Sequence, residues 1–363
     1  MICREIIRNR LTFALMSVIR QMFSRGRILP LLLIIIMLVV WRYRQREELI
    51  SLTGTTFGSI AYHIKYKDPQ SRNFQSSIDS LLRVFNTSLN HYWPESELSL
   101  FNKDSTFNFN IPYFLPVLEQ SRVIYKASSG AFNPAVMPLV NAWGFGPDKS
   151  MTPDSVTIDS LLQLVDFTQV RFDQQHVWKL DPRVQLDFSA IAKGYAVDVL
   201  IKFLSDQGIN DSFVEIGGEV GCRGTNKEGK PWNIGIIDPA SDVLNQSFIA
   251  TVAISDMAVA TSANNFNYVV RDGVRYTHTI NPKTGYPSHS NMLSASVFAH
   301  SCMTADGVAT AFMEAGFDAA RSILQKTDTL DAFLVYSKPD GGVATFSTPR
   351  IRNDLQLISS SKP

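Results

Sequence analysis

The residues best suited to chemistry in this chain gather between positions 276 and 316. From about Met303 the sequence is rich in alanine and predicts a helix with one apolar face. Asp306 and Thr310 are four residues apart, so on such a helix they project from the same face. A carboxylate beside a hydroxyl offers the oxygen ligands that a hard cation such as Mg²⁺ prefers. The alternative is that Thr310 bonds back to a carbonyl and Asp306 is a solvated first-turn acid.

His278 lies ahead of this helix, in an alternating segment that predicts a strand ending at the Asn281-Pro282 turn. Near neutral pH a histidine can take a proton from a hydroxyl, so His278 is a candidate general base. A histidine with a purely structural role is the common alternative. None of the six histidines pairs with another at a metal-ligand spacing such as HxxxH.

Lys193 lies within the start of a second predicted helix, which the segment over 186–198 enters and which runs to about Gln207. Beside Gly194, amide donors and the helix dipole favour an anion such as a phosphate. The alternative is a solvated helix lysine. The sequence contains neither GxxxxGK[ST] nor GxGxxG, and it lacks GxSxG, SxxK and HExxH. Walker, Rossmann and common hydrolase sites are therefore not supported.

The composition is that of a globular protein with ample material for a core. Of 363 residues, 45% are hydrophobic and 18% are charged, and the net charge is +1. Nothing in this balance favours a nucleic-acid partner. The three cysteines form no CxxC pair, and a single bridge between Cys222 and Cys302 stays open.

The N-terminal part has the pattern of a membrane anchor. Residues 1–27 are basic and residues 28–41 are uninterrupted apolar, with arginines following. The apolar run is short for a full span but has the length of a signal-peptide core, and no small-x-small cleavage site follows it. We expect an uncleaved signal anchor, with Met22 as a second possible start. The basic flank favours the N-terminal end inside and the bulk of the chain outside. We therefore expect a location in the cell inner membrane, with the catalytic domain on the periplasmic side. The alternative is a buried core helix.

The rest of the chain reads as an α+β fold. After a linker over 42–50 we expect one catalytic domain of mixed antiparallel strands and helices over 51–350, and a tail over 351–363. Strands and helices that do not alternate regularly favour α+β over a doubly wound sheet. The expected elements include helices over 69–91 and 114–128 and strands over 56–66, 232–237 and 248–252.

Taken together, these stretches resemble the ApbE family, the Mg²⁺-dependent FAD:protein FMN transferases. The resemblance covers roughly residues 51–350 and rests on several motifs in the family's order. They are Ser129-Gly130-Ala131-Phe132-Asn133-Pro134, Asp187-Phe188-Ser189-Ala190-Ile191-Ala192-Lys193-Gly194-Tyr195, Gly217-Gly218-Glu219, His278-Thr279-Ile280-Asn281-Pro282-Lys283-Thr284-Gly285 and Ala305-Asp306-Gly307-Val308-Ala309-Thr310.

The resemblance implies that the chain cleaves the pyrophosphate of FAD, places FMN on a threonine hydroxyl of an acceptor flavoprotein and releases AMP. By position, Asp306, Thr310 and the carbonyl of Ala190 match the family's Mg²⁺ site, and His278 matches the histidine expected to deprotonate the threonine. The positions that match FAD contacts are Tyr92, Ala131, Phe132, Asn133, Asp187, Lys193 and Ile280.

Two other functions fit the same residues, namely a Mg²⁺-dependent FAD pyrophosphatase that yields FMN and AMP, and a non-catalytic FAD-binding protein. The sequence also departs from the family pattern. Asn133 stands where many members have aspartate, Thr53 where methionine is usual, and Ser262-Ala263 where Ser-Gly is common. No Asp-Gly-Ala-Thr-like acceptor motif is present, so we do not expect the chain to modify itself.

Overall fold

The computed structural model describes residues 34, 35, 37, 48–147, 153–241, 245–263, 268–271, 274–277, 279–288 and 290–358. It divides into two units, Met1–Glu48 with Asp68–Arg72, and Leu49–Lys67 with Asn73–Pro363. The predicted anchor over 28–41 lies almost entirely outside the described residues. Among those that are described, no helix is long and apolar enough to cross a membrane.

An eight-stranded sheet forms the centre of the second unit. Every pair of neighbouring strands with a described register is antiparallel, which confirms the predicted mixture of antiparallel strands and helices. In spatial order the strands are β1 (Glu48–Thr56), β2 (Ile60–Asp68), β6 (Ser212–Ile216), β7 (Glu219–Arg223), β10 (Met257–Ala263), β13 (Met292–Ala299), β14 (Asp331–Ser337) and β15 (Val343–Ser347).

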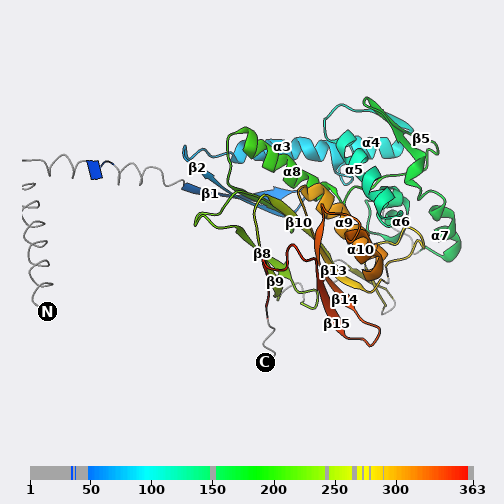
Figure 1. Ribbon diagram of the computed structural model, residues 1–363. Helices are drawn as coiled ribbons and strands as arrows, with labels where there is room; N and C mark the ends of the chain where they lie inside the picture. Colours follow the sequence, from blue (N-terminus) through cyan, green and yellow to red (C-terminus); the bar gives the residue numbers. More distant parts are fainter. Residues whose placement is uncertain are drawn as a thin grey trace, which may run out of the picture. The chain divides into compact units, whose positions relative to one another are not determined.

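Helices cover one face of this sheet. α8 (Ala192–Asp206) packs on β6 and β7, and α9 (Cys302–Ala315) packs on β10 and β13, as Figure 1 shows. Each helix buries an apolar stripe against the sheet, which explains the helical period of its sequence. The other helices are α3 (Gln75–Leu89), α4 (Glu97–Lys103), α5 (Phe114–Ala127), η1 (Pro134–Val136), α6 (Met137–Trp143), α7 (Ser155–Leu162), η2 (Phe167–Gln169) and α10 (Phe317–Leu324).

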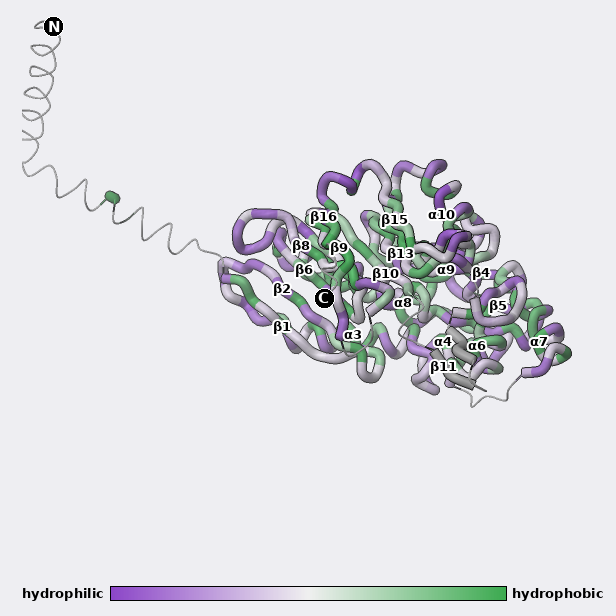
Figure 2. The backbone as a smooth tube through the Cα atoms, turned by 90° about the horizontal axis from the view of Figure 1, so that it is seen from below, coloured by the Kyte–Doolittle hydropathy of each residue, from purple (hydrophilic) through white to green (hydrophobic). Residues whose placement is uncertain are grey.

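A small sheet covers the other face, in the order β16 (Leu355–Leu357), β9 (Phe248–Ile254) and β8 (Trp232–Ile237). Figure 2 shows these strands side by side, with hydrophobic segments along β9. Alternate side chains of β8 are buried with residues of the large sheet in a second core, so the fold has three layers. The remaining strands are β3 (Thr106–Asn108), β4 (Val170–Phe172), β5 (His176–Lys179), β11 (Tyr268–Arg271) and β12 (Val274–Thr277).

Several sequence expectations need correction. The strand expected over 56–66 is divided by a turn at Phe57 and Gly58, whose φ angles of +49° and +89° reverse the chain between β1 and β2. The helix expected from residue 69 begins only at Gln75. Cys222 and Cys302 are both buried and free, so the possible disulfide does not form. The helix expected over 114–128 is confirmed by α5.

Candidate functional site

One large cavity, of about 1270 Å³, gathers ten of the eleven predicted site residues. This volume is ample for a ligand larger than a typical drug molecule. His278 lies outside the described residues, although its neighbour Thr279 lines the cavity. The predicted residues along the wall are Tyr92, Ala131, Phe132, Asn133, Asp187, Ala190, Lys193, Ile280, Asp306 and Thr310.

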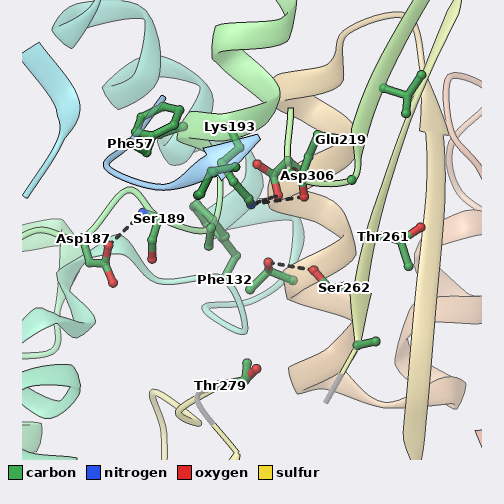
Figure 3. Close-up of a pocket in the computed structure, with 18 of the residues that line it drawn as sticks. Phe57, Phe132, Asp187, Ser189, Lys193, Glu219, Thr261, Ser262, Thr279 and Asp306 are labelled. Carbon is green, nitrogen blue, oxygen red and sulfur yellow. Dashed lines mark hydrogen bonds and ion pairs between the residues drawn. The ribbon is translucent and has the colours of Figure 1, made fainter. Parts of the chain in front are cut away.

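A lysine and two carboxylates meet at one end of this cavity (Figure 3). The Lys193 Nζ lies 3.1 Å from Glu219 Oε1 and 3.9 Å from Asp306 Oδ1. Burial raises the pKa of both carboxyls, and the ammonium only partly offsets it. Burial alone would lower the pKa of Lys193, but Asp306 and Glu219 together hold it above its usual value. The cluster contains two carboxylates and one ammonium, so a further cation or proton is needed to neutralise its net negative charge.

Gly194 lets the two helices that carry Lys193 and Asp306 approach each other. A Cβ at position 194 would lie 2.3 Å from the carbonyl oxygen of Cys302 and 2.8 Å from the Asp306 Cβ. Only glycine leaves this space free, and its N–H donates to Asp306 Oδ2 at 3.0 Å. The Lys-Gly pair in the sequence thus places an ammonium and a backbone donor beside the same carboxylate.

Asp198, one turn along α8, holds the start of α9. Its carboxylate accepts hydrogen bonds from the N–H groups of Cys302 and Met303, at 2.8 and 2.9 Å, and from the Ser301 hydroxyl at 2.7 Å. These N–H groups have no partner within their own helix, so an acceptor there stabilises its first turn. Asp198 therefore fixes the helix that presents Asp306, a role the sequence analysis did not assign.

The oxygen groups near Asp306 fit a hard divalent cation. In a regular helix the N–H of Gly194 would bond to the carbonyl of Ala190, but here it bonds to Asp306 and leaves that carbonyl without this partner. The Thr310 hydroxyl lies 3.2 Å from the Ser262 hydroxyl, which is also at the cavity wall. The buried Oε2 of Glu219 has no hydrogen-bond partner among the described residues. The donor set is a carboxylate with neutral oxygens, the chemistry that Mg²⁺ takes.

Among the proposed ligands only the carboxylate of Asp306 is charged. Within the part of the chain that the structure describes, no group of three His, Cys, Asp or Glu side chains is placed to hold a metal. Mg²⁺ is commonly bound by one or two carboxylates and completed by substrate phosphates and water. The arrangement at Asp306 therefore suits a cation that arrives with, or is completed by, a phosphate-containing substrate.

Another part of the cavity wall is built around Asp187. Its Oδ1 lies 3.3 Å from His91 Nδ1 and accepts from the Ser189 N–H at 2.8 Å. Burial alone would raise the pKa of Asp187, but these two partners hold it below its usual value. The Tyr92 ring packs 4.1 Å from the His91 ring, and its hydroxyl donates to the Phe145 carbonyl. An anionic carboxylate and an aromatic ring here offer an acceptor and a stacking surface to a heterocycle.

His91 was missed by the sequence analysis, although it directly precedes Tyr92. It is buried, lines the cavity, and its Nε2 has no hydrogen-bond partner among the described residues. Glu219 was noted only as part of a motif, and its pairing with Lys193 is a contact between residues distant in sequence. The signal available in the sequence was its position directly after Gly217 and Gly218.

The three departures from the family pattern have different structural settings. The Asn133 side chain accepts from the Ala135 N–H at 3.0 Å and donates to the Val165 carbonyl at 3.1 Å, a donation that an aspartate could not make. Thr53 is exposed on β1 and is not among the residues lining the cavity. Ser262, in contrast, lines the cavity beside Thr310.

Glu314 is a further acid that the sequence analysis did not single out. It follows Asp306 and Thr310 at the same spacing of four on α9 and lines the same cavity. It is 7% exposed, and neither carboxylate oxygen has a hydrogen-bond partner among the described residues. Burial raises its pKa to about 7, and the nearby Ser288 hydroxyl offsets only part of this rise. The spacing with Asp306 and Thr310 was the signal that could have revealed it.

Comparisons with known proteins agree on one family. The model of the ApbE family matches residues 55–334. An FAD:protein FMN transferase of Vibrio cholerae is 36% identical over 304 residues, covering 81% of this chain and 89% of the relative. One from Haemophilus influenzae is 33% identical over 319 residues, covering 84% and 91%.

Solved structures show the same likeness. The flavin transferase ApbE from Vibrio cholerae has a TM-score of 0.76 and 31% identity, over 85% of this chain and 99% of that one. The apo flavinyl transferase ApbE of Pseudomonas stutzeri has a TM-score of 0.74 and 29% identity, over 85% and 97%. The likeness extends over nearly the whole length of each solved chain.

Proposed function

This chain belongs to the ApbE family and is an FAD:protein FMN transferase, and we propose that it uses Mg²⁺ and transfers FMN to a threonine hydroxyl. The observation that carries the proposal is the cluster of Lys193, Glu219 and Asp306 beside Thr310 in one cavity. An ammonium and hard oxygen ligands at one point suit the cleavage of a phosphoanhydride, in which negative charge develops on phosphoryl oxygens.

The proposed metal ligands are Asp306, Thr310 and the carbonyl of Ala190. When bound, Mg²⁺ would neutralise charge on the phosphoryl oxygens of FAD. Lys193 would contact the same pyrophosphate, because its ammonium stays protonated between two carboxylates. FAD contacts are proposed for Tyr92, Ala131, Phe132, Asn133, Asp187, Lys193 and Ile280, all of which line the cavity.

The transfer step balances with a single base. The threonine oxygen forms a bond to the phosphorus of the FMN half, and the bond from that phosphorus to the bridging oxygen breaks. The hydroxyl proton passes to His278, and AMP leaves with the bridging oxygen. We propose His278 as this base from its sequence position, next to Thr279 and Ile280 at the cavity wall. Water in place of threonine would give FMN and AMP, which is the pyrophosphatase alternative.

Asp306→Ala tests the metal site directly. We expect the variant to release no AMP from FAD above background, while its fold, followed by circular dichroism, stays intact. Chelation by EDTA should have the same effect on the wild type. Normal AMP release by Asp306→Ala, or by the wild type in EDTA, would overturn the assignment. Asp318→Ala, which removes an exposed acid on α10, serves as the matched control and should release AMP at the wild-type rate.

Acceptor peptides test the threonine target and the base. A peptide containing Asp-Gly-Ala-Thr should gain the mass of FMN, and the same peptide with alanine for threonine should not. His278→Ala should reduce this transfer far more than it reduces FAD binding. Equal labelling of both peptides would exclude the threonine target, and an unchanged transfer rate in His278→Ala would exclude the base.

We also propose that residues 28–41 anchor the chain in the inner membrane with the catalytic part on the periplasmic side. The support is the apolar run with arginines on both sides. Cell fractionation should find the full chain in membranes that have been washed at alkaline pH. Recovery of the full chain in the soluble fraction would contradict the proposal.

A further inference from the structure

β8 is an edge strand, and its unpaired edge borders the cavity. In the order β16-β9-β8, β9 occupies one side of β8, and no described strand occupies the other. Successive side chains of a strand point to opposite faces of its sheet. Asn233, Ile234 and Gly235 follow one another, yet all three line the cavity. Three consecutive residues of one strand reach the cavity, so we infer that the backbone of β8 and its free edge form part of the cavity wall.

The surroundings of this edge are open and apolar. Phe248 of β9 is 52% exposed although its ring is large and apolar, and it lines the same cavity. Its ring lies against Gly235, where a Cβ would be 2.5 Å from the ring. Gly235 therefore keeps β8 without a side chain at this point, and the backbone is accessible beside an aromatic surface. Ile237, at the end of β8, also lines the cavity.

We propose that the segment of the acceptor protein that carries the receiving hydroxyl binds in extended form along β8 and adds a strand to the small sheet. An edge strand presents unpaired N–H and C=O groups, and only another extended backbone satisfies them in alternation. The edge lies in the cavity that holds Lys193 and Asp306, so a side chain of the added strand can point towards them. This inference rests on the proposed transfer to a protein hydroxyl.

A scan of backbone methylation in the acceptor peptide tests the proposal. Full-length enzyme, FAD and Mg²⁺ are incubated with peptides containing Asp-Gly-Ala-Thr, each with one backbone nitrogen methylated. Transfer is followed by the mass of the flavinylated peptide. In an antiparallel or parallel pair, alternate N–H groups point to the partner strand. We therefore expect kcat/KM to fall at every second position, by roughly two- to tenfold for each lost hydrogen bond.

The outcomes of this scan distinguish strand addition along β8 from the proposed transfer to a protein hydroxyl. Loss at alternate positions supports strand addition. Transfer to the unmodified peptide with no alternation overturns strand addition but leaves the proposed function standing. Cleavage of FAD without transfer to any unmodified peptide overturns both, because no protein hydroxyl would then be an acceptor.

Amide hydrogen exchange identifies the strand. Addition of the acceptor peptide should slow exchange at amides of Asn233–Ile237 in β8. The matched control is β15, which is one of the two edge strands of the large sheet and has no residue in the cavity wall. Its amides over Val343–Ser347 should exchange as before. Unchanged exchange in β8, or the same slowing by FAD alone, would overturn the proposal, since the latter would assign the edge to the flavin.

Phe248→Ala adds a test from the enzyme side. Removal of the exposed ring should raise KM for the acceptor peptide several-fold more than KM for FAD. Val343→Ala removes another exposed apolar side chain, from β15 outside the cavity, and should change neither value. A larger effect of Phe248→Ala on KM for FAD than on KM for the peptide would place the ring against the flavin and contradict acceptor binding there.

Discussion

Replacing Glu314 by glutamine should remove a pH-dependent loss of stability that this buried carboxyl imposes on the fold. Glu314 is buried, and burial disfavours its charged form, an effect that the nearby Ser288 hydroxyl offsets only in part. It also lies near the C-terminal end of α9, where the helix dipole disfavours negative charge. The folded chain therefore keeps it protonated to a higher pH than the unfolded chain does. The neutral amide of glutamine has nearly the same shape and does not titrate.

The magnitude follows from the two pKa values. The pKa is raised from 4.5 to about 7 on folding. At about 1.4 kcal/mol per unit, this difference corresponds to about 3 kcal/mol. Because the folded state binds the proton more tightly, stability falls as pH rises from the unfolded to the folded pKa. This loss of stability is absent at a pH below both pKa values and complete at a pH above both.

Urea denaturation of the wild type and of Glu314→Gln, followed at about pH 4 and about pH 8, measures this difference. Other titrating groups contribute equally to both proteins and cancel in the comparison. We expect the free energy of unfolding of the wild type, relative to the variant, to drop by about 3 kcal/mol between the two pH values. Asp318→Asn, which neutralises an exposed acid on α10, should follow the wild type. A constant difference between wild type and Glu314→Gln would refute the reasoning.

Three further substitutions test how the site is built. Gly194→Ala should slow AMP release on the order of a hundredfold, because the new methyl group must push Lys193 away from Asp306, and a wild-type rate would contradict this. Asp198→Ala should lower the free energy of unfolding in urea by about 1–3 kcal/mol, since the buried N–H groups at the start of α9 lose their acceptor. An unchanged denaturation midpoint would rule out that role. Asn133→Asp should destabilise by a similar amount. An aspartate at this position cannot donate to the Val165 carbonyl. A melting temperature of this variant at or above that of the wild type would contradict the prediction.

Much of this site could be predicted from the sequence because the relevant signals are local. The spacing of four between Asp306 and Thr310, and the Lys-Gly pair at the start of α8, define helix faces without any knowledge of the fold. The structure adds that the two helices meet at Gly194.

The residues that were missed depend on tertiary contacts. Glu219 belongs to the site because it pairs with Lys193, and His91 because it pairs with Asp187. Both pairs join residues that are distant in the sequence. The spacing of Glu314 from Asp306 and Thr310 indicates a shared helix face, but its burial is set by the layers packed around α9. The division of β1 from β2 was missed because Phe57, a bulky residue, adopts a positive φ in the turn.

The central claim is that one cavity both cleaves FAD and delivers its FMN half to a threonine. The most direct test is to count both products in one reaction of the full-length chain with FAD, Mg²⁺ and a peptide containing Asp-Gly-Ala-Thr. We expect one flavinylated peptide for each AMP released, with little AMP when the peptide is omitted. AMP and free FMN appearing at the same rate with or without the peptide would contradict the account and identify water as the acceptor.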